Sequence, residues 1–218
     1  MKKAIIILLQ LSICYLGFAQ QTLGLFLNTD SSYNGYTLFA PIGSTTTYLI
    51  DNCGQEVHTW PSTRKPGNSV YMNNDGSITR PGMAVGNAVF GGGGGGGGFA
   101  EKIDWNGNLL WSFKFSDTTK MQHHDICPLP NGNVLLLAWE RFDSLTAVEA
   151  GRNPALIYDG FVWCEFIVEI QPVGATGGNI IWEWHLWDHL IQDFDSTKIN
   201  IDNTGETKRY SSYDIKHD

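Results

Sequence analysis

The chain is poor in basic side chains and has no run of them. It carries 14 lysines and arginines against 22 acidic residues, which gives a formal net charge of -8 at pH 7. A protein that binds nucleic acid needs clustered Lys and Arg side chains to neutralise phosphates. The composition therefore excludes nucleic acid as a partner.

Several motifs of common enzymes are also missing. The sequence contains no Gly-x-Ser-x-Gly nucleophile elbow, no phosphate-binding P-loop and no dinucleotide fingerprint. These absences exclude the common serine hydrolases and the enzymes that use a nucleotide. We predict that the protein uses neither a cofactor nor a metal ion.

Long apolar runs are rare, and the one that exists is N-terminal. Lys2 and Lys3 precede an apolar run from Ala4 to Leu16, and small residues follow at positions 17 and 19. This arrangement is typical of a secretory signal peptide, and the run is too short to span a membrane comfortably. We predict a signal peptide at residues 1–19, a periplasmic or extracellular protein and no stable membrane insertion. An uncleaved signal that anchors the protein is the alternative.

Cysteine is scarce too, with 4 in the whole chain. Cys14 lies in the predicted signal peptide, so Cys53, Cys127 and Cys164 remain in a compartment where disulfides form. Three is an odd number, so at least one thiol is unpaired. The sequence leaves open which two of them would pair.

What the chain does contain is a repeated hairpin. The segments from Tyr48 to Trp60 and from Glu101 to Trp111 alternate apolar and polar residues, turn at Asn, Asp or Gly, and end on a tryptophan. A looser third copy runs from Val168 to Trp182. A second type of hairpin turns at Asp75-Gly76 and at Asn131-Gly132. Two hairpins together predict one four-stranded sheet.

Like units recur after roughly fifty residues, a spacing typical of β-propeller blades. We predict an all-β fold in which residues 20–218 form about three blades of a β-propeller. Closed propellers have about four to eight blades, so we expect the chain to be truncated at its C-terminus. One edge of such a fragment is expected to expose unpaired backbone and apolar side chains. The glycine run from Gly91 to Gly98 is interpreted as a connecting loop.

Two histidine-rich segments are candidates for chemistry. His123 and His124 precede a strongly apolar strand, and the inner strands of propeller blades bring such residues together around a central channel. The alternative is that one imidazole merely satisfies a buried strand end. In the second segment, His185 and His189 would share one face of a helical turn beside Asp188. Metal binding is conceivable there, but the neighbouring Trp182, Trp184 and Trp187 favour packing between blades or stacking on an aryl or sugar ligand.

Together these segments resemble the bacterial arylsulfotransferase family of secreted propellers. The resemblance lies in five segments: Gly35 to Pro41, Thr47 to Trp60, Asp104 to Trp111, His123 to Ile126 with Pro130 to Asn133, and Trp184 to Asp193.

The resemblance implies a six-bladed propeller that moves a sulfuryl group from an aryl sulfate donor to a phenolic acceptor through a sulfated histidine, without a nucleotide donor. It also implies that His124, or else His123, is a sulfate ligand or proton donor. The family's His-x-Asn segment, its channel arginine and its nucleophilic histidine are carried over to no residue of this chain, and His217 is not taken as catalytic. The chain alone is therefore expected to be inactive. The alternative is a non-catalytic propeller that binds a glycan, an aromatic ligand or a protein partner.

Overall fold

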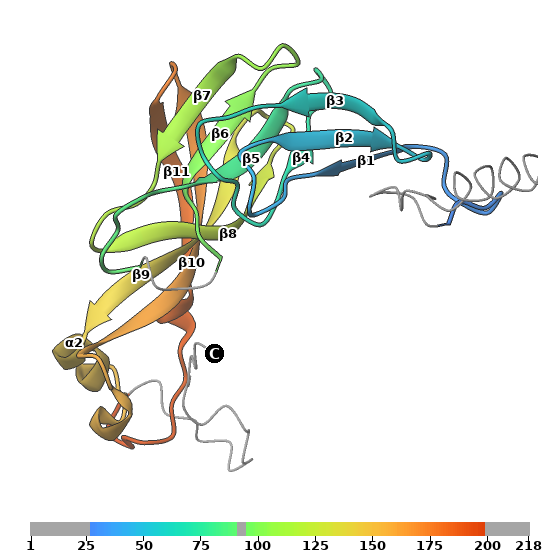
Figure 1. Ribbon diagram of the computed structural model, residues 1–218. Coiled ribbons are helices and arrows are strands. Elements are labelled where there is room, and N and C mark those ends of the chain that lie inside the picture. Colours follow the sequence, from blue (N-terminus) through green and yellow to red (C-terminus); the bar gives the residue numbers. More distant parts are fainter. Residues whose placement is uncertain (1–26, 91–94, 199–218) are drawn as a thin grey trace, which may run out of the picture.

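The computed structural model describes residues 27–90 and 95–198 (Figure 1). The predicted signal peptide and His217 lie outside these residues. Within them the chain forms antiparallel sheets and a few short helices, so the predicted all-β class is confirmed. No described helix is long and apolar enough to cross a membrane.

The strands form three sheets, each built from consecutive strands. The first sheet contains β1 (Tyr36–Phe39), β2 (Thr47–Asp51) and β3 (Glu56–Trp60). The second contains β4 (Tyr71–Met72), β5 (Ile78–Met83), β6 (Gly98–Ile103) and β7 (Leu109–Lys114). The third contains β8 (Lys120–Pro128), β9 (Val134–Asp143), β10 (Phe161–Val173) and β11 (Gly177–His185).

Short helices lie at the end of the third sheet. They are α2 (Ser144–Glu149) and two 3₁₀ turns, η1 (Pro154–Leu156) and η2 (Leu186–His189). Asp143 begins α2 because its side chain accepts a hydrogen bond from the backbone N–H of Thr146. These elements connect β9 with β10 and follow β11.

The four tight turns that the sequence predicts are all present. The glycines of these turns have left-handed backbone angles, with φ of 74° at Gly54, 79° at Gly76, 85° at Gly107 and 87° at Gly132. Glycine adopts this conformation without the steric cost that a Cβ brings. The looser third hairpin is confirmed as well, because β10 pairs with β11.

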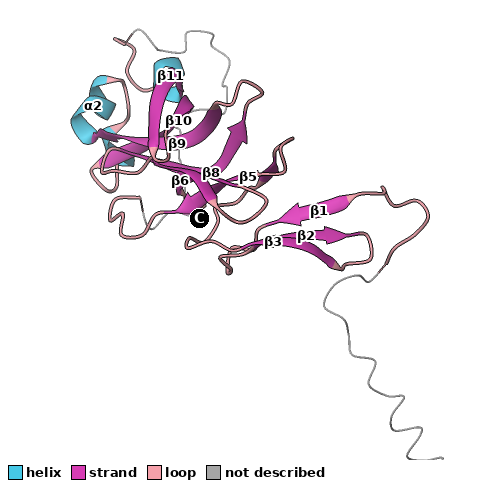
Figure 2. Cartoon of the chain, turned by 90° about the horizontal axis from the view of Figure 1, so that it is seen from above, coloured by secondary structure: helices cyan, strands magenta, loops and turns pink. Residues whose placement is uncertain are grey.

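The sheets follow one another in space in the order of the chain (Figure 2). Leu49 and Trp60 of the first sheet pack with Ile78 and Ile103 of the second. A larger core lies between the second and third sheets. Its buried residues are Ala100, Trp111, Phe115, Ile126, Val134, Leu136, Ala138, Phe166, Val168 and Ile170.

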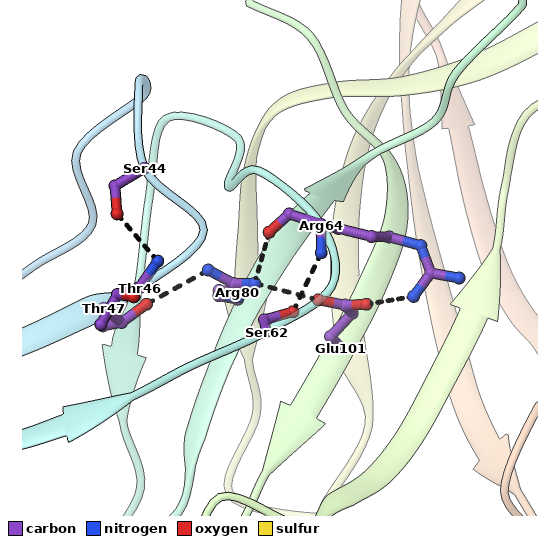
Figure 3. A network of polar contacts seen from close by, with 7 residues as sticks. All are labelled: Ser44, Thr46, Thr47, Ser62, Arg64, Arg80 and Glu101. Carbon is purple, nitrogen blue, oxygen red and sulfur yellow. Dashed lines mark hydrogen bonds and ion pairs between the residues drawn. The ribbon is translucent and has the colours of Figure 1, made fainter.

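A buried ion network joins the first two sheets (Figure 3). Arg80 and Glu101 are both 0% exposed, and Nη2 of Arg80 lies 3.4 Å from a carboxylate oxygen of Glu101. Arg80 also donates to the hydroxyl of Thr47 on β2. The other oxygen of Glu101 lies 2.7 Å from Nη1 of Arg64. The network therefore links β2, β5, β6 and the segment that follows β3.

The tryptophan that ends each repeated hairpin has a recurrent role. The indole N–H of Trp60 donates to the carbonyl oxygen of Asp104 in the next sheet, at 3.0 Å. The indole N–H of Trp111 donates to the carbonyl of Gly177, again in the next sheet, at 2.8 Å. Each tryptophan thus attaches its own sheet to a turn of the following one.

The predicted packing of Trp182, Trp184 and Trp187 between sheets is not seen in the described residues. Trp182 is 48% exposed. Trp184 stacks on His189 and Trp187 stacks on Phe142, so both contact rings of the third sheet or of the turn that follows it. Trp182 occupies the position of Trp60 and Trp111, but no further sheet stands beside it among the described residues.

Candidate functional site

The histidine pair lies in an irregular part of β8. This strand pairs with β9 at Gln122 and resumes its pairing at Ile126, so the residues between them bulge out of the ladder. His124 has a φ of 50°, which makes it the one described non-glycine residue in the left-handed region. Such a conformation is uncommon for a side chain with a Cβ, and it persists only where surrounding contacts hold it.

Buried hydrogen bonds hold the bulge in place. Gln122 is 0% exposed; its side-chain amide donates to the carbonyls of His123 and Asp125, while its oxygen accepts from the N–H of Gly98. The N–H of His124 donates to the carbonyl of Gly95 at 2.8 Å. The backbone around the two histidines is therefore fixed by groups of β8 itself and of the glycine segment.

The described part of the glycine run connects β5 with β6, as the interpretation of a connecting loop expects, and it also supports the site. A Cβ on Gly95 would collide with the ring of His124, and one on Gly97 would collide with the side chain of Gln122. Glycine is needed here because the backbone approaches both side chains closely. Residues 91–94 lie outside the described part.

His123 is the buried member of the pair, with 2% exposure. Its ring stacks on Trp139, with centroids 3.9 Å apart. Its Nε2 lies 2.7 Å from Oε2 of Glu165 on β10, and the other oxygen of Glu165 accepts from the indole N–H of Trp139 at 3.1 Å. Glu165 therefore accepts hydrogen bonds on both of its oxygens.

His124 is the exposed member, and its Nδ1 lies 2.7 Å from Nδ1 of His123. Desolvation and repulsion from His123 lower the pKa of His124, although Glu165 and Asp125 act in the opposite direction. The neutral form of His124 is thus favoured near pH 7. A hydrogen-bonded chain runs from Glu165 through His123 to an imidazole that reaches the surface.

Asp125, the third residue of the bulge, contacts the second sheet. The hydroxyl of Tyr71 on β4 donates to Oδ1 of Asp125 at 3.0 Å. Burial and this carboxylate raise the pKa of Tyr71. Since β4 and β8 are edge strands of their sheets, the contact brings the first strands of two successive sheets together.

The second histidine segment is divided between two environments. His185 ends β11, and its Nδ1 lies 3.0 Å from both carboxylate oxygens of Glu140. His189 instead stacks on Trp184. Burial raises the pKa of Glu140, against the opposing effect of His185. In residues 27–90 and 95–198 no three His, Cys, Asp or Glu side chains are placed to hold a metal ion.

The three cysteines of the predicted exported protein are all unpaired in the structure. Cys53 and Cys127 are exposed, whereas Cys164 is buried on β10. Burial, with a smaller contribution from Glu140, raises the pKa of the Cys164 thiol to about 12. The structure therefore forms no disulfide among these three cysteines.

Sequence reasoning missed the residues that support the histidine pair. Glu165 was not singled out, although a charged residue inside the apolar run from Phe161 to Ile170 is a signal for a buried polar contact. Gln122 and Tyr71 carried no signal of their own. Tyr71 bonds Asp125 on another strand, and Gln122 bonds the bulge of its own strand and Gly98 of β6.

Comparison with known proteins adds no family. No protein-family model and no curated protein matches the chain. The resemblance to arylsulfotransferases therefore rests only on the five sequence segments named above. Membership of that family stays a prediction.

Proposed function

We propose that this chain forms one wall of a nucleotide-independent arylsulfate sulfotransferase site, exported to the periplasm or beyond it. The observation that carries the proposal is the hydrogen-bonded chain from Glu165 through buried His123 to exposed His124. An imidazole oriented by a second group, itself oriented by a carboxylate, is a common arrangement for general acid–base and nucleophilic catalysis.

In the proposed reaction, a sulfuryl group leaves the phenolic oxygen of an aryl sulfate and reaches a second phenol. The transfer needs hydrogen-bond donors for the sulfuryl oxygens and a group that moves a proton between the phenols. His124 has the exposure and geometry to contact the sulfuryl group and the phenols, and buried His123 orients its ring through the bond between the two Nδ1 atoms. A separate histidine, which the family resemblance carries over to no residue here, acts as the nucleophile.

We also propose that the sheets are successive blades of a β-propeller that further sheets complete. Two features support this. The four-stranded sheets have the same order of consecutive antiparallel strands, and they pack on one another in chain order. The edge strands β4 and β8 meet through Tyr71 and Asp125, as inner strands around a common channel would.

The test of the function is release of a chromogenic phenol from its sulfate ester in the presence of a second phenol. We expect the product of the complete reading frame to release phenol without any nucleotide, at a rate that depends on the acceptor phenol. The 218-residue chain alone is expected to be inactive, because the proposed nucleophile lies outside it. A complete product that never transfers sulfuryl groups would contradict the proposal, and so would turnover by the chain alone.

The position of Trp182 provides a test of the propeller. In the complete protein we expect its indole N–H to donate to a carbonyl of a following sheet, as Trp60 and Trp111 do. Trp182→Phe should then lower the free energy of unfolding by about 1 kcal/mol in the complete protein and have no effect in the 218-residue chain. Trp111→Phe is the matched control, since its acceptor lies within the chain and both forms should lose stability. Equal effects of Trp182→Phe in the two forms would argue against a further sheet.

A binding function without catalysis is the second candidate. Neighbouring apolar side chains of β11 are exposed, with Ile180 at 45%, Ile181 at 53% and Trp182 at 48%. Exposed aromatic and apolar patches are common at binding surfaces. The same phenol assay separates the two functions. Extension of the reading frame separates them too, because a His-x-Asn segment, an arginine and a further histidine are expected only for the enzyme.

A further inference from the structure

The two rings of the histidine pair share one hydrogen. Nδ1 of His123 and Nδ1 of His124 are 2.7 Å apart, so one of these nitrogens carries a hydrogen and the other accepts it. Nε2 of His123 faces Glu165, and a carboxylate can only accept, so this nitrogen carries a hydrogen as well. Three of the four ring nitrogens are thereby engaged inside the protein.

The fourth nitrogen, Nε2 of His124, makes no hydrogen bond with any residue that the structure describes. We infer that Nε2 of His124 is the one nitrogen of the pair that exchanges a proton with groups outside the pair, and that Glu165 and His123 are positioning residues that set its tautomer. In the neutral pair His123 holds its hydrogen on Nε2 and accepts on Nδ1. His124 must then hold its hydrogen on Nδ1, which leaves a lone pair on Nε2.

A proton that arrives at Nε2 of His124 makes the pair a cation. The shared hydrogen can then move from Nδ1 of His124 to Nδ1 of His123, which transfers the positive charge to His123, against the carboxylate of Glu165. No other bond changes, and the reverse steps return the proton to Nε2. The two imidazoles therefore act as one hydrogen-bonded unit with a single exchange point, Nε2 of His124.

The role of Nε2 of His124 in catalysis rests on the proposed sulfuryl transfer. The assignment of the tautomers does not depend on that reaction. In that reaction Nε2 of His124 takes the proton of the acceptor phenol as its oxygen bonds to sulfur, and it gives a proton to the departing phenolate oxygen of the donor. The titratable groups that face His124 are His123, Glu165 and Asp125. Of these, Glu165 affects His124 through its hydrogen bond with His123 and the hydrogen that the two rings share.

Replacement of Glu165 by glutamine tests the inference because an amide has only one acceptor oxygen. The carboxylate now accepts from both the indole of Trp139 and the imidazole of His123. An indole N–H can only donate, so the amide oxygen stays on Trp139 and the amide NH₂ faces His123. His123 can adapt by moving its hydrogen to Nδ1, and His124 then carries its hydrogen on Nε2. We expect the tautomers of both rings to invert in Glu165→Gln.

A second substitution should reverse this inversion. Trp139→Phe removes the competing donor but retains an aromatic ring beside His123. In the double variant the amide oxygen is released to accept from His123, so the wild-type tautomers should return. Glu169→Gln is the matched control: it makes the same change of charge on the same strand, but its partners are Asn131 and Asn133. It should leave both tautomers unchanged.

The measurement is long-range ¹H–¹⁵N correlation of ¹⁵N-histidine-labelled protein at a pH where the pair is neutral, with assignment by single substitutions. The expected wild-type spectrum has a bare Nε2 on His124 and a protonated Nε2 on His123. A protonated Nε2 on neutral wild-type His124 would overturn the inference, as would unchanged tautomers in folded Glu165→Gln. This readout needs no turnover, so a protein with the expected tautomers but no sulfuryl transfer would refute the proposed function alone.

Discussion

Replacement of His124 by alanine should lower sulfuryl transfer by about a hundredfold to a thousandfold in the complete protein, which is the usual loss when one acid–base or charge-stabilising group is removed. The fold should survive because the ring is exposed. His123→Ala should also reduce turnover, since it breaks the link between Glu165 and His124. The measurement is the phenol-release assay on variants with wild-type circular dichroism.

Two further variants separate catalysis from backbone strain. His124 has a φ of 50°, and asparagine tolerates this region better than alanine. His124→Asn should therefore fold at least as well as His124→Ala and be just as inactive. His189→Ala removes another exposed imidazole, one that stacks on Trp184, and should leave turnover unchanged. Wild-type turnover in both the His123 and His124 variants would reduce the pair to a structural role.

Loss of Glu101 should have the largest effect on stability. Glu101→Ala leaves the guanidinium of Arg80 buried without its counter-charge, and breaking a buried ion pair in this way typically costs about 3–5 kcal/mol. Desolvation already lowers the pKa of Arg80, and Glu101 provides the main opposing effect. The free energy of unfolding, measured by urea titration, should fall by this amount.

An exposed ion pair is the control for this result. Asp75 and Lys102 form a contact of 3.0 Å between side chains that are 58% and 36% exposed. Asp75→Asn should change the free energy of unfolding by less than about 1 kcal/mol, because exposed pairs are screened by water and salt. Similar losses in Glu101→Ala and Asp75→Asn would mean that the buried network contributes no more than the exposed pair.

The location of the network makes this prediction independent of the first. Arg80 and Glu101 lie on β5 and β6 of the second sheet, and Arg80 reaches Thr47 of the first, whereas the histidine pair is anchored to β10 of the third sheet through Glu165. Glu101→Ala should therefore act through the folded fraction, with the activity of the folded molecules unchanged. His124→Ala should instead lower the activity of the folded molecules and leave the folded fraction unchanged.

The histidine site was predicted only in part from the sequence. The adjacent pair His123-His124 came from the segment itself, and the preference for His124 came from the resemblance to arylsulfotransferases. The carboxylate that orients the pair is Glu165, and it is separated from His123 by 42 positions in the chain. Only the register of β8, β9 and β10 brings it into contact, and that register includes a bulge that no local pattern indicates.

The sequence by itself determined the hairpins. The turns at Gly54, Gly76, Gly107 and Gly132 depend on residues that are adjacent in the chain, so their chemistry can be read from a few neighbouring letters. The tertiary structure decided what those hairpins contact: the burial of His123 against Glu165, the close approach of Gly95 to His124 and the exposure of Trp182. These features follow from the packing of one sheet on the next, where the partner of each residue is set by the arrangement of the whole sheet and by no local preference.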